Sequence, residues 1–158
     1  MKKYFLFILV FFMMLFIIGC ENTHTSYNIE EYTEEHLFFF INSFTCSACR
    51  YQLIELNKHW DEIKEKSVKI HIIMPGTTNE AANLKETLGL KFNIETVDGL
   101  FFHDKVGLTK IDENGEKKPS RGYAYIVNGE LIESELDDNF GTNSIEIINK
   151  LLDCGCQP

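Results

Sequence analysis

The sequence predicts an α/β fold in three layers, with a central mixed β-sheet flanked by helices. Three observations support this prediction. A phenylalanine-rich run ends at a C-x-x-C pair that opens a helical pattern, a second apolar run leads into a capped helix, and an Asn-Gly turn joins two strands late in the chain. A βαβα succession favours parallel strands, whereas a two-residue turn joins antiparallel ones, so one sheet is expected to contain both kinds of pairing.

The beginning of the chain matches an export signal. Lys2 and Lys3 precede a run of fifteen apolar residues, Tyr4–Ile18, which is short for a membrane span of ~20 residues and typical of a signal-peptide core. The run leads into Gly19-Cys20, and this end resembles a bacterial lipobox. The resemblance implies that residues 1–19 are a lipoprotein signal peptide and that Cys20 becomes the lipidated N-terminus. The alternative is an uncleaved anchor, which would also export and tether the domain.

Composition divides the rest of the chain into three parts. Residues 20–35 are polar and acidic without a sustained apolar period, so we expect a tether. Residues 36–153 are expected to form one folded domain, and residues 154–158 a short tail. The whole chain has 158 residues and a net charge of −9, which disfavours nucleic acid and anionic membrane surfaces as partners.

The first strand and helix of the domain follow from two apolar patterns. His36–Asn42 is apolar on both faces, which is typical of a central strand covered on both sides. From Cys46 to about Lys66, apolar residues recur at three- and four-residue steps and predict a helix. Trp60 lies on this apolar stripe, so we expect it in the core rather than as a substrate platform.

The later elements are predicted from their caps and turns. A helix with Thr77 or Thr78 as its cap is expected to end at Gly89, and the Asn128-Gly129 turn predicts a hairpin. The remaining predictions are strands at Val68–Met74 and Leu90–Thr96, a short helix at Leu100–Val106, an exposed hairpin or loop at Lys110–Ser120, hairpin strands at Gly122–Val127 and Glu130–Leu136, and a last helix capped by Thr142 or Asn143 with Ile145, Ile148, Leu151 and Leu152 inside.

Cys46 and Cys49 follow the first predicted strand and lie at the start of the first predicted helix. Unpaired backbone N–H groups and the helix dipole favour a negative charge at that position, so we expect Cys46 to be the thiolate nucleophile. Cys49 lies one turn further in, within disulfide reach and better covered, and is expected to resolve the mixed disulfide. A structural disulfide or half of a zinc knuckle is the alternative for such a pair.

This order of strand, turn, C-x-x-C and helix resembles the thioredoxin fold. Together with the N-terminal signal, it is similar to the TlpA/ResA-type thioredoxin-like proteins that bacteria anchor outside the cytoplasm. The resemblance implies a thiol–disulfide oxidoreductase that uses no cofactor and no metal. It places Thr45, Ser47 and Ala48 around the site, with Thr45 where many relatives carry tryptophan.

The resemblance also implies a cis-proline beside the cysteines, and here the sequence departs from the pattern. The expected place falls near Arg121, where there is no proline. Pro119 takes that role only if the loop register is altered. Otherwise Ser120 and Arg121 face the site, and Arg121 is a candidate to stabilise the Cys46 thiolate.

Two more features bear on the site. The first strand carries no buried acid of the kind that thioredoxins use for proton transfer at the resolving cysteine, and Glu95 is a candidate to approach from elsewhere. His103 follows two phenylalanines. We expect a surface or loop histidine there rather than a copper ligand beside the cysteines.

The C-terminal tail carries a second close pair, Cys154 and Cys156. Three interpretations remain open for it. It is a second dithiol that exchanges with Cys46 and Cys49, it joins them in binding a soft metal such as zinc or copper(I), or it is an oxidised, inert tail.

The sequence thus favours an extracytoplasmic, lipid-anchored thiol–disulfide oxidoreductase of the cell envelope, with resemblance leaning it towards reduction. Its expected partners are exported protein thiols or disulfides, a membrane electron donor and the membrane itself, reached through the N-terminal lipid. The alternatives are a metal-binding or metal-delivery lipoprotein and a redox-inert, thioredoxin-like binding module.

Overall fold

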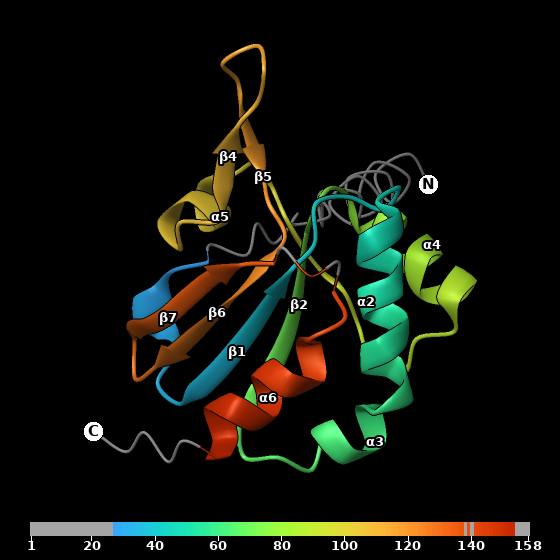
Figure 1. Cartoon of the computed structure of the whole chain (residues 1–158), viewed down its shortest axis with the longest axis vertical. Coiled ribbons are helices and arrows are strands. Elements are labelled where there is room, and N and C mark those ends of the chain that lie inside the picture. The colour runs from blue at the N-terminus through green and yellow to red at the C-terminus, as the bar shows by residue number, and fades with distance from the viewer. Residues whose placement is uncertain (1–26, 138, 140, 154–158) are drawn as a thin grey trace, which may run out of the picture.

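The computed structural model describes residues 27–137, 139 and 141–153 (Figure 1). Its elements in chain order are η1 (Ile29–Glu31), β1 (Glu35–Phe40), α2 (Ser47–Lys58), α3 (Trp60–Ile63), β2 (Lys69–Pro75), α4 (Thr78–Leu88), β3 (Glu95–Val97), α5 (Phe101–Lys105), β4 (Thr109–Ile111), β5 (Lys117–Pro119), β6 (Gly122–Val127), β7 (Glu130–Leu136) and α6 (Ser144–Asp153). The main sheet has the order β3-β2-β1-β6-β7, and β4 and β5 pair separately. β1 pairs in parallel with β2 and antiparallel with β6. The predicted mixed sheet flanked by helices is confirmed.

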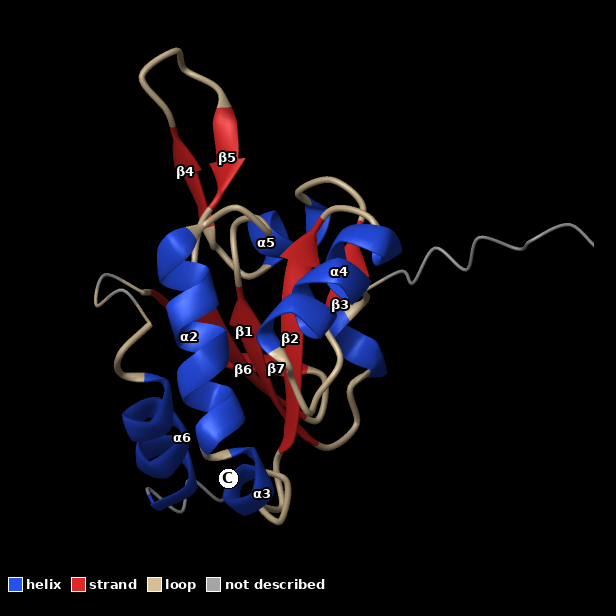
Figure 2. Ribbon diagram, turned by 90° about the vertical axis from the view of Figure 1, so that its right-hand side faces the viewer, coloured by secondary structure: helices blue, strands red, loops and turns tan. Residues whose placement is uncertain are grey.

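The sheet separates two hydrophobic cores. Leu37 and Phe39 of β1 pack with α2, α3, α4 and α6 on one face, whereas Phe38 and Phe40 pack with η1 and α5 on the other. Alternate residues of a strand point to opposite faces, and both faces of β1 are buried here. This explains why the strand reads as a continuous apolar run. Figure 2 shows α2 and α4 in front of the sheet.

The helix predicted from Cys46 to about Lys66 is shorter and divided. α2 ends at Lys58, the backbone turns at His59, and α3 follows as a separate short helix. No glycine or proline lies at this turn, so packing rather than local preference sets it. The turn brings Trp60 against Phe92, with ring centroids 4.6 Å apart, and the prediction that Trp60 packs on the core is confirmed.

The predicted cap and stop of α4 and the Asn-Gly turn are present. The side-chain cap predicted for α6 is wrong: among the described residues the Asn143 side-chain oxygen is buried without a hydrogen-bond partner, and the Thr142 hydroxyl donates to the Asn139 carbonyl. Thr77 forms the capping box of α4 with Glu80, and Gly89 ends that helix in the left-handed conformation. β4 and β5 form the exposed hairpin, which projects from the end of the domain where α2 begins (Figures 1 and 2). The first residue of β6, Gly122, has no room for a side chain, because a Cβ atom there would lie 2.4 Å from the carbonyl oxygen of Glu135.

The folded part of the chain begins earlier than predicted. The tether was expected to reach Glu35, yet Tyr27 and Ile29 are buried in the second core. The Tyr27 ring stacks on Phe102 at a centroid distance of 4.8 Å. Its hydroxyl donates to Glu95 at 3.2 Å. The segment looked polar because only its occasional apolar residues face the sheet.

The end of the domain agrees with the predicted helix. Ile148 is buried on the inner face of α6, as is Ile147, while Ile145 and Leu151 are partly buried against the first core. The Leu152 side chain, Cys20, Cys154 and Cys156 lie outside the described residues. Within the described ranges, every helix is too short or too polar to cross a membrane.

Candidate active site at the start of helix α2

Cys46 and Cys49 are joined by a disulfide at the beginning of α2, with their Cα atoms 5.2 Å apart. Cys46 is the N-cap residue, in an extended conformation, and its Sγ accepts a hydrogen bond from the Cys49 backbone N–H at 3.1 Å. A sulfur that caps a helix faces unpaired N–H groups and the positive end of the helix dipole. The position therefore favours the thiolate form over the thiol.

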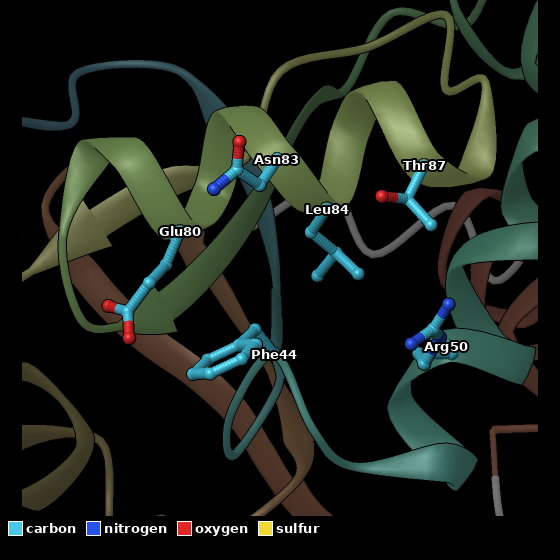
Figure 3. Close-up of a pocket in the computed structure, with 6 residues that line it drawn as sticks. All are labelled: Phe44, Arg50, Glu80, Asn83, Leu84 and Thr87. Atoms are coloured by element: carbon cyan, nitrogen blue, oxygen red, sulfur yellow. The ribbon is translucent and has the colours of Figure 1, made fainter.

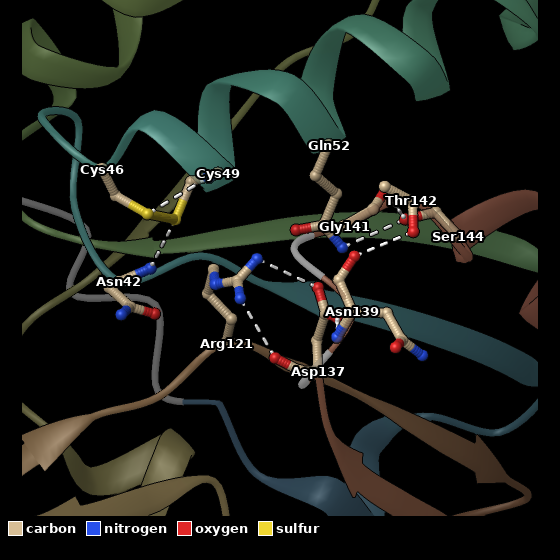
Figure 4. Close-up of polar contacts among 10 residues, drawn as sticks. All are labelled: Asn42, Cys46, Cys49, Gln52, Arg121, Asp137, Asn139, Gly141, Thr142 and Ser144. Carbon is tan, nitrogen blue, oxygen red and sulfur yellow. Dashed lines mark hydrogen bonds and ion pairs between the residues drawn. A yellow bond between two sulfur atoms is a disulfide. The ribbon is translucent and has the colours of Figure 1, made fainter.

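The two sulfurs differ in exposure. Cys49 is fully buried, whereas Cys46 is half-buried at the surface end of the helix. The backbone N–H of Asn42 donates to the Cys49 sulfur at 3.4 Å (Figure 4). A partner molecule can therefore reach Cys46 but not Cys49 without local opening.

The loop before the cysteines is held by its own hydrogen bonds. The Cys46 N–H donates to the Ser43 carbonyl at 3.4 Å, and the hydroxyls of Ser43 and Thr45 lie 3.1 Å apart. Thr45 and Ser47 are exposed on either side of Cys46, and Ala48 is half-buried. The three residues lie next to the cysteines at the surface, and their role in a site stays a prediction.

Arg121 enters the site from the position directly before β6. β1 and β6 are antiparallel, and the last residue of β1, Phe40, pairs with Gly122. Arg121 therefore lies beside the start of the loop that connects β1 to Cys46. Its guanidinium donates to the Asp137 carboxylate at 3.2 Å and to the Asp137 carbonyl at 3.1 Å. Figure 4 shows this guanidinium between the disulfide and Asp137. The side chain is 11% exposed and that of Asp137 only 2%.

Pro119 does not fill the place of a cis-proline. It lies in β5, paired with Thr109 in the projecting hairpin, and every described peptide bond, including its own, is trans. Ser120 is buried between hairpin and sheet, where its N–H donates to the Leu108 carbonyl at 2.9 Å. Arg121 is therefore the member of this trio that lies at the site.

Gln52 was missed in the sequence. It follows Cys49 by one helical turn, is buried, and donates through Nε2 to the Ser144 hydroxyl at 3.1 Å. Gly141 passes so close that a Cβ atom on it would lie 2.4 Å from the Gln52 Cβ. Among the described residues, the side-chain oxygens of Gln52 and Asn42 are buried without a hydrogen-bond partner. The i,i+3 spacing from Cys49 was the available signal.

Glu95 and His103 lie on the opposite face of the sheet from Cys49. Glu95 accepts from Tyr27 and lies 2.7 Å from the His71 ring. It therefore does not replace the missing acid at the resolving cysteine.

The expectation of a surface or loop position for His103 is wrong. The residue is fully buried in α5, edge-on to Phe40, because α5 turns its apolar face into the second core. Burial lowers the pKa of His103 to about 4. Among the described residues neither of its ring nitrogens has a hydrogen-bond partner, and no cluster of three or more ligand residues suits a metal ion.

The fold and the disulfide together define a thioredoxin-like protein with a vicinal dithiol at a helix start. No protein-family model matches the chain, and no curated protein matches it in sequence. Solved structures with a similar fold include peroxiredoxins. Xylella fastidiosa PrxQ has a TM-score of 0.64 and 11% identity, over 75% of this chain and 76% of that one.

Two other peroxiredoxins give the same result. The Xanthomonas campestris bacterioferritin comigratory protein has a TM-score of 0.62 and 11% identity, over 75% of this chain and 78% of its own. Peroxidoxin BcpB of Mycobacterium tuberculosis has a TM-score of 0.62 and 9% identity, over 82% and 85% of the two chains. At these identities the similarity establishes the thioredoxin-like fold alone.

Proposed function

We propose that this protein is a thiol–disulfide oxidoreductase that uses Cys46 as nucleophile and Cys49 as resolving residue. The observation that carries the proposal is the unequal exposure of two sulfurs already within disulfide distance. Thiol–disulfide exchange requires one accessible, thiolate-forming sulfur and a second that attacks only after the first has reacted. A purely structural disulfide does not require this asymmetry.

In the reducing direction, the Cys46 thiolate attacks one sulfur of a partner disulfide. The partner's S–S bond breaks, its other sulfur leaves as a thiolate, and a mixed disulfide with Cys46 forms. The Cys49 thiolate then attacks the Cys46 sulfur, which releases the partner's second thiolate and closes the Cys46–Cys49 disulfide. Two electrons have passed to the partner, and an external dithiol restores the pair by the reverse exchange.

Arg121 supports this chemistry in the proposal. A fixed guanidinium beside the helix start favours the anionic form of Cys46 and of a departing thiolate. Its hydrogen bonds to Asp137 hold it in place, so the cation costs little to reorganise when charge moves between the sulfurs.

The cellular setting is part of the proposal and rests on the N-terminal sequence. Cleavage before Cys20 and acylation of that cysteine would place the domain in the cell envelope, tethered to a membrane and outside the cytoplasm. Disulfides persist in such compartments. The proposed partners are exported proteins with cysteines and a membrane electron donor, and similarity to the TlpA/ResA type favours reduction over oxidation.

The C-terminal cysteines, Cys154 and Cys156, take no part in this cycle in the proposal. α6 starts beside Gln52 and runs away from the hairpin end of the domain, as both ribbon views show (Figures 1 and 2). A helix of ten residues advances ~15 Å. Its last residue, Asp153, therefore lies at the end of α6 that points away from Gln52, and we propose that the tail does not exchange with the disulfide of its own chain.

The test is the reduction potential of the Cys46–Cys49 pair in the full chain, with and without Cys154→Ser and Cys156→Ser. A potential near ~−270 mV supports a reductase, and one near ~−120 mV an oxidant. A pair that stays oxidised well below ~−300 mV behaves as a structural disulfide and overturns the proposal. The same preparation should reduce insulin, and Cys46→Ser should abolish that activity. Hydrogen peroxide as substrate tests whether the chain also shares the chemistry named for its structural neighbours.

A further inference from the structure

A small groove opens between the start of α2, where the cysteines lie, and the helix α4. It has a volume of about 120 Å³ and is lined by Phe44, Arg50, Glu80, Asn83, Leu84 and Thr87 (Figure 3). Phe44 precedes Cys46 by two residues, and Arg50 directly follows Cys49. Two of its lining residues thus neighbour the cysteines in the chain, so the groove is a candidate to contact the segment that flanks a partner's cysteine.

The floor of the groove is apolar and its size is limited. Leu84 is buried at the bottom, and Phe44 is 43% exposed although it is a large apolar side chain. Pockets for small molecules and cofactors usually have volumes of about 300–1,000 Å³. The groove is therefore better matched to one side chain of a polypeptide than to a free cofactor.

The two ends of the groove carry opposite charges. Figure 3 shows Glu80 at one end and Arg50 with Thr87 at the other. The Glu80 carboxylate is already engaged, because it accepts from the N–H and the hydroxyl of Thr77 at 2.8 and 2.9 Å, and these bonds lower its pKa. By contrast, the described residues provide no hydrogen-bond or ion-pair partner for the guanidinium of Arg50, in a chain whose net charge is −9.

Arg50 is also well placed relative to the nucleophile. It follows Cys46 by four residues, and its N–H donates to the Cys46 carbonyl at 3.0 Å, so Arg50 stands one helical turn after the N-cap residue. One turn is a rise of ~5.4 Å, and two residues of extended peptide span ~6.6 Å. A carboxylate two residues from a partner's cysteine would reach the Arg50 end of the groove.

We propose that this groove selects cysteine segments of partner proteins that carry an acidic residue about two positions from the cysteine and an apolar side chain between or beside them. The apolar side chain packs on Phe44 and Leu84, and the carboxylate pairs with Arg50. The inference rests on the proposed exchange reaction at Cys46 and adds the substrate class to it. An acidic segment is selected because the guanidinium of Arg50 is the charged group of the groove that has no ion-pair partner among the described residues.

The experiment compares symmetrical disulfides of short cysteine peptides that differ at one position, two residues from the cysteine, as Glu, Gln or Lys. The reduced full-length protein is mixed with each peptide, and the rate constant for its reduction is divided by that for dithiothreitol with the same peptide. This division removes the intrinsic reactivity of each disulfide. An exposed ion pair contributes up to about 1 kcal/mol, so the Glu peptide should react about fivefold faster than the Gln peptide, and the Lys peptide more slowly than both.

Charge variants test the assignment to Arg50. Arg50→Gln should bring the Glu-to-Gln ratio to about one, and Arg50→Glu should make the Lys peptide the best of the three. Lys58→Gln removes a cation from the other end of α2 and should leave the ratio unchanged. The wild-type ratio should also fall as salt is raised.

The outcomes separate the two levels of the proposal. Equal normalised rates for all peptides with the wild-type protein would overturn the acidic selection while leaving the exchange reaction intact. A ratio that survives in Arg50→Gln would assign the selection to another part of the surface and reject the groove. Failure of the wild-type protein to reduce any peptide would reject the oxidoreductase function itself.

Discussion

Arg121 and Asp137 form an almost completely buried ion pair at the base of the candidate active site. The guanidinium donates to the carboxylate at 3.2 Å, and the Asp137 N–H returns a bond to the Arg121 carbonyl at 3.0 Å. The pair joins the residue before β6 to the residue after β7. Local sequence gives no sign of it, because the two residues are sixteen positions apart.

Removing one member of this pair should be costly. Arg121→Met leaves a carboxylate buried without its partner and should lower the free energy of unfolding by about 3 kcal/mol. Urea denaturation of the oxidised protein measures this value. The double variant Arg121→Met, Asp137→Leu should lose less than the sum of the two single variants. Strict additivity would show that the pair does not interact energetically.

The two active-site cysteines should differ in their reactivity towards iodoacetamide. In the reduced native protein, Cys49 should be alkylated at least about tenfold more slowly than Cys46, because a buried sulfur reacts only after local opening. Peptide mapping by mass spectrometry follows each cysteine separately, and the protein unfolded in urea is the control. Equal native rates would contradict the assigned roles.

Gly141 should tolerate no side chain. Its φ is +77° and a Cβ atom would collide with Gln52, so Gly141→Ala should destabilise the fold by roughly 2–3 kcal/mol. Gly89→Ala is the matched control, because Gly89 has a similar φ of +59° and no atom near its missing Cβ. Only the backbone strain of roughly 1 kcal/mol should appear there. Equal losses at both positions would rule out the contact with Gln52.

Buried His103 should make stability depend on pH. Burial lowers its pKa from 6.5 to about 4, so between these values the unfolded chain binds more protons than the folded one. Stability should therefore fall as pH falls through this window, by roughly 3 kcal/mol in all. The difference in unfolding free energy between wild type and His103→Leu, measured by urea denaturation from pH 4 to 7, reports this contribution.

His59→Leu provides the control for that series. His59 is 43% exposed at its side chain, so its replacement removes a histidine without emptying a buried site. If His103→Leu keeps the same slope as wild type, the pH dependence arises elsewhere and the buried, neutral imidazole is not its source.

Elements with local signals were predicted well. The capping box at Thr77, the stop at Gly89 and the hairpin around Asn128-Gly129 depend on residues within a few positions of one another, and such patterns are visible in one dimension. The C-x-x-C at the start of α2 belongs to the same class. The break at His59 and the buried start at Tyr27 have no such signal, because contacts with distant residues decide them.

The sequence by itself determined the order of strands and helices, the mixed sheet and the place of Cys46 and Cys49 at a helix start, since periodicity, caps and turns act over short stretches of chain. Only the tertiary structure decided that Pro119 belongs to a projecting hairpin, that Arg121 reaches the site and pairs with Asp137, and that His103 is buried. The physical reason is that burial and pairing depend on which distant residues the sheet brings together. Local sequence patterns carry no information on those long-range contacts.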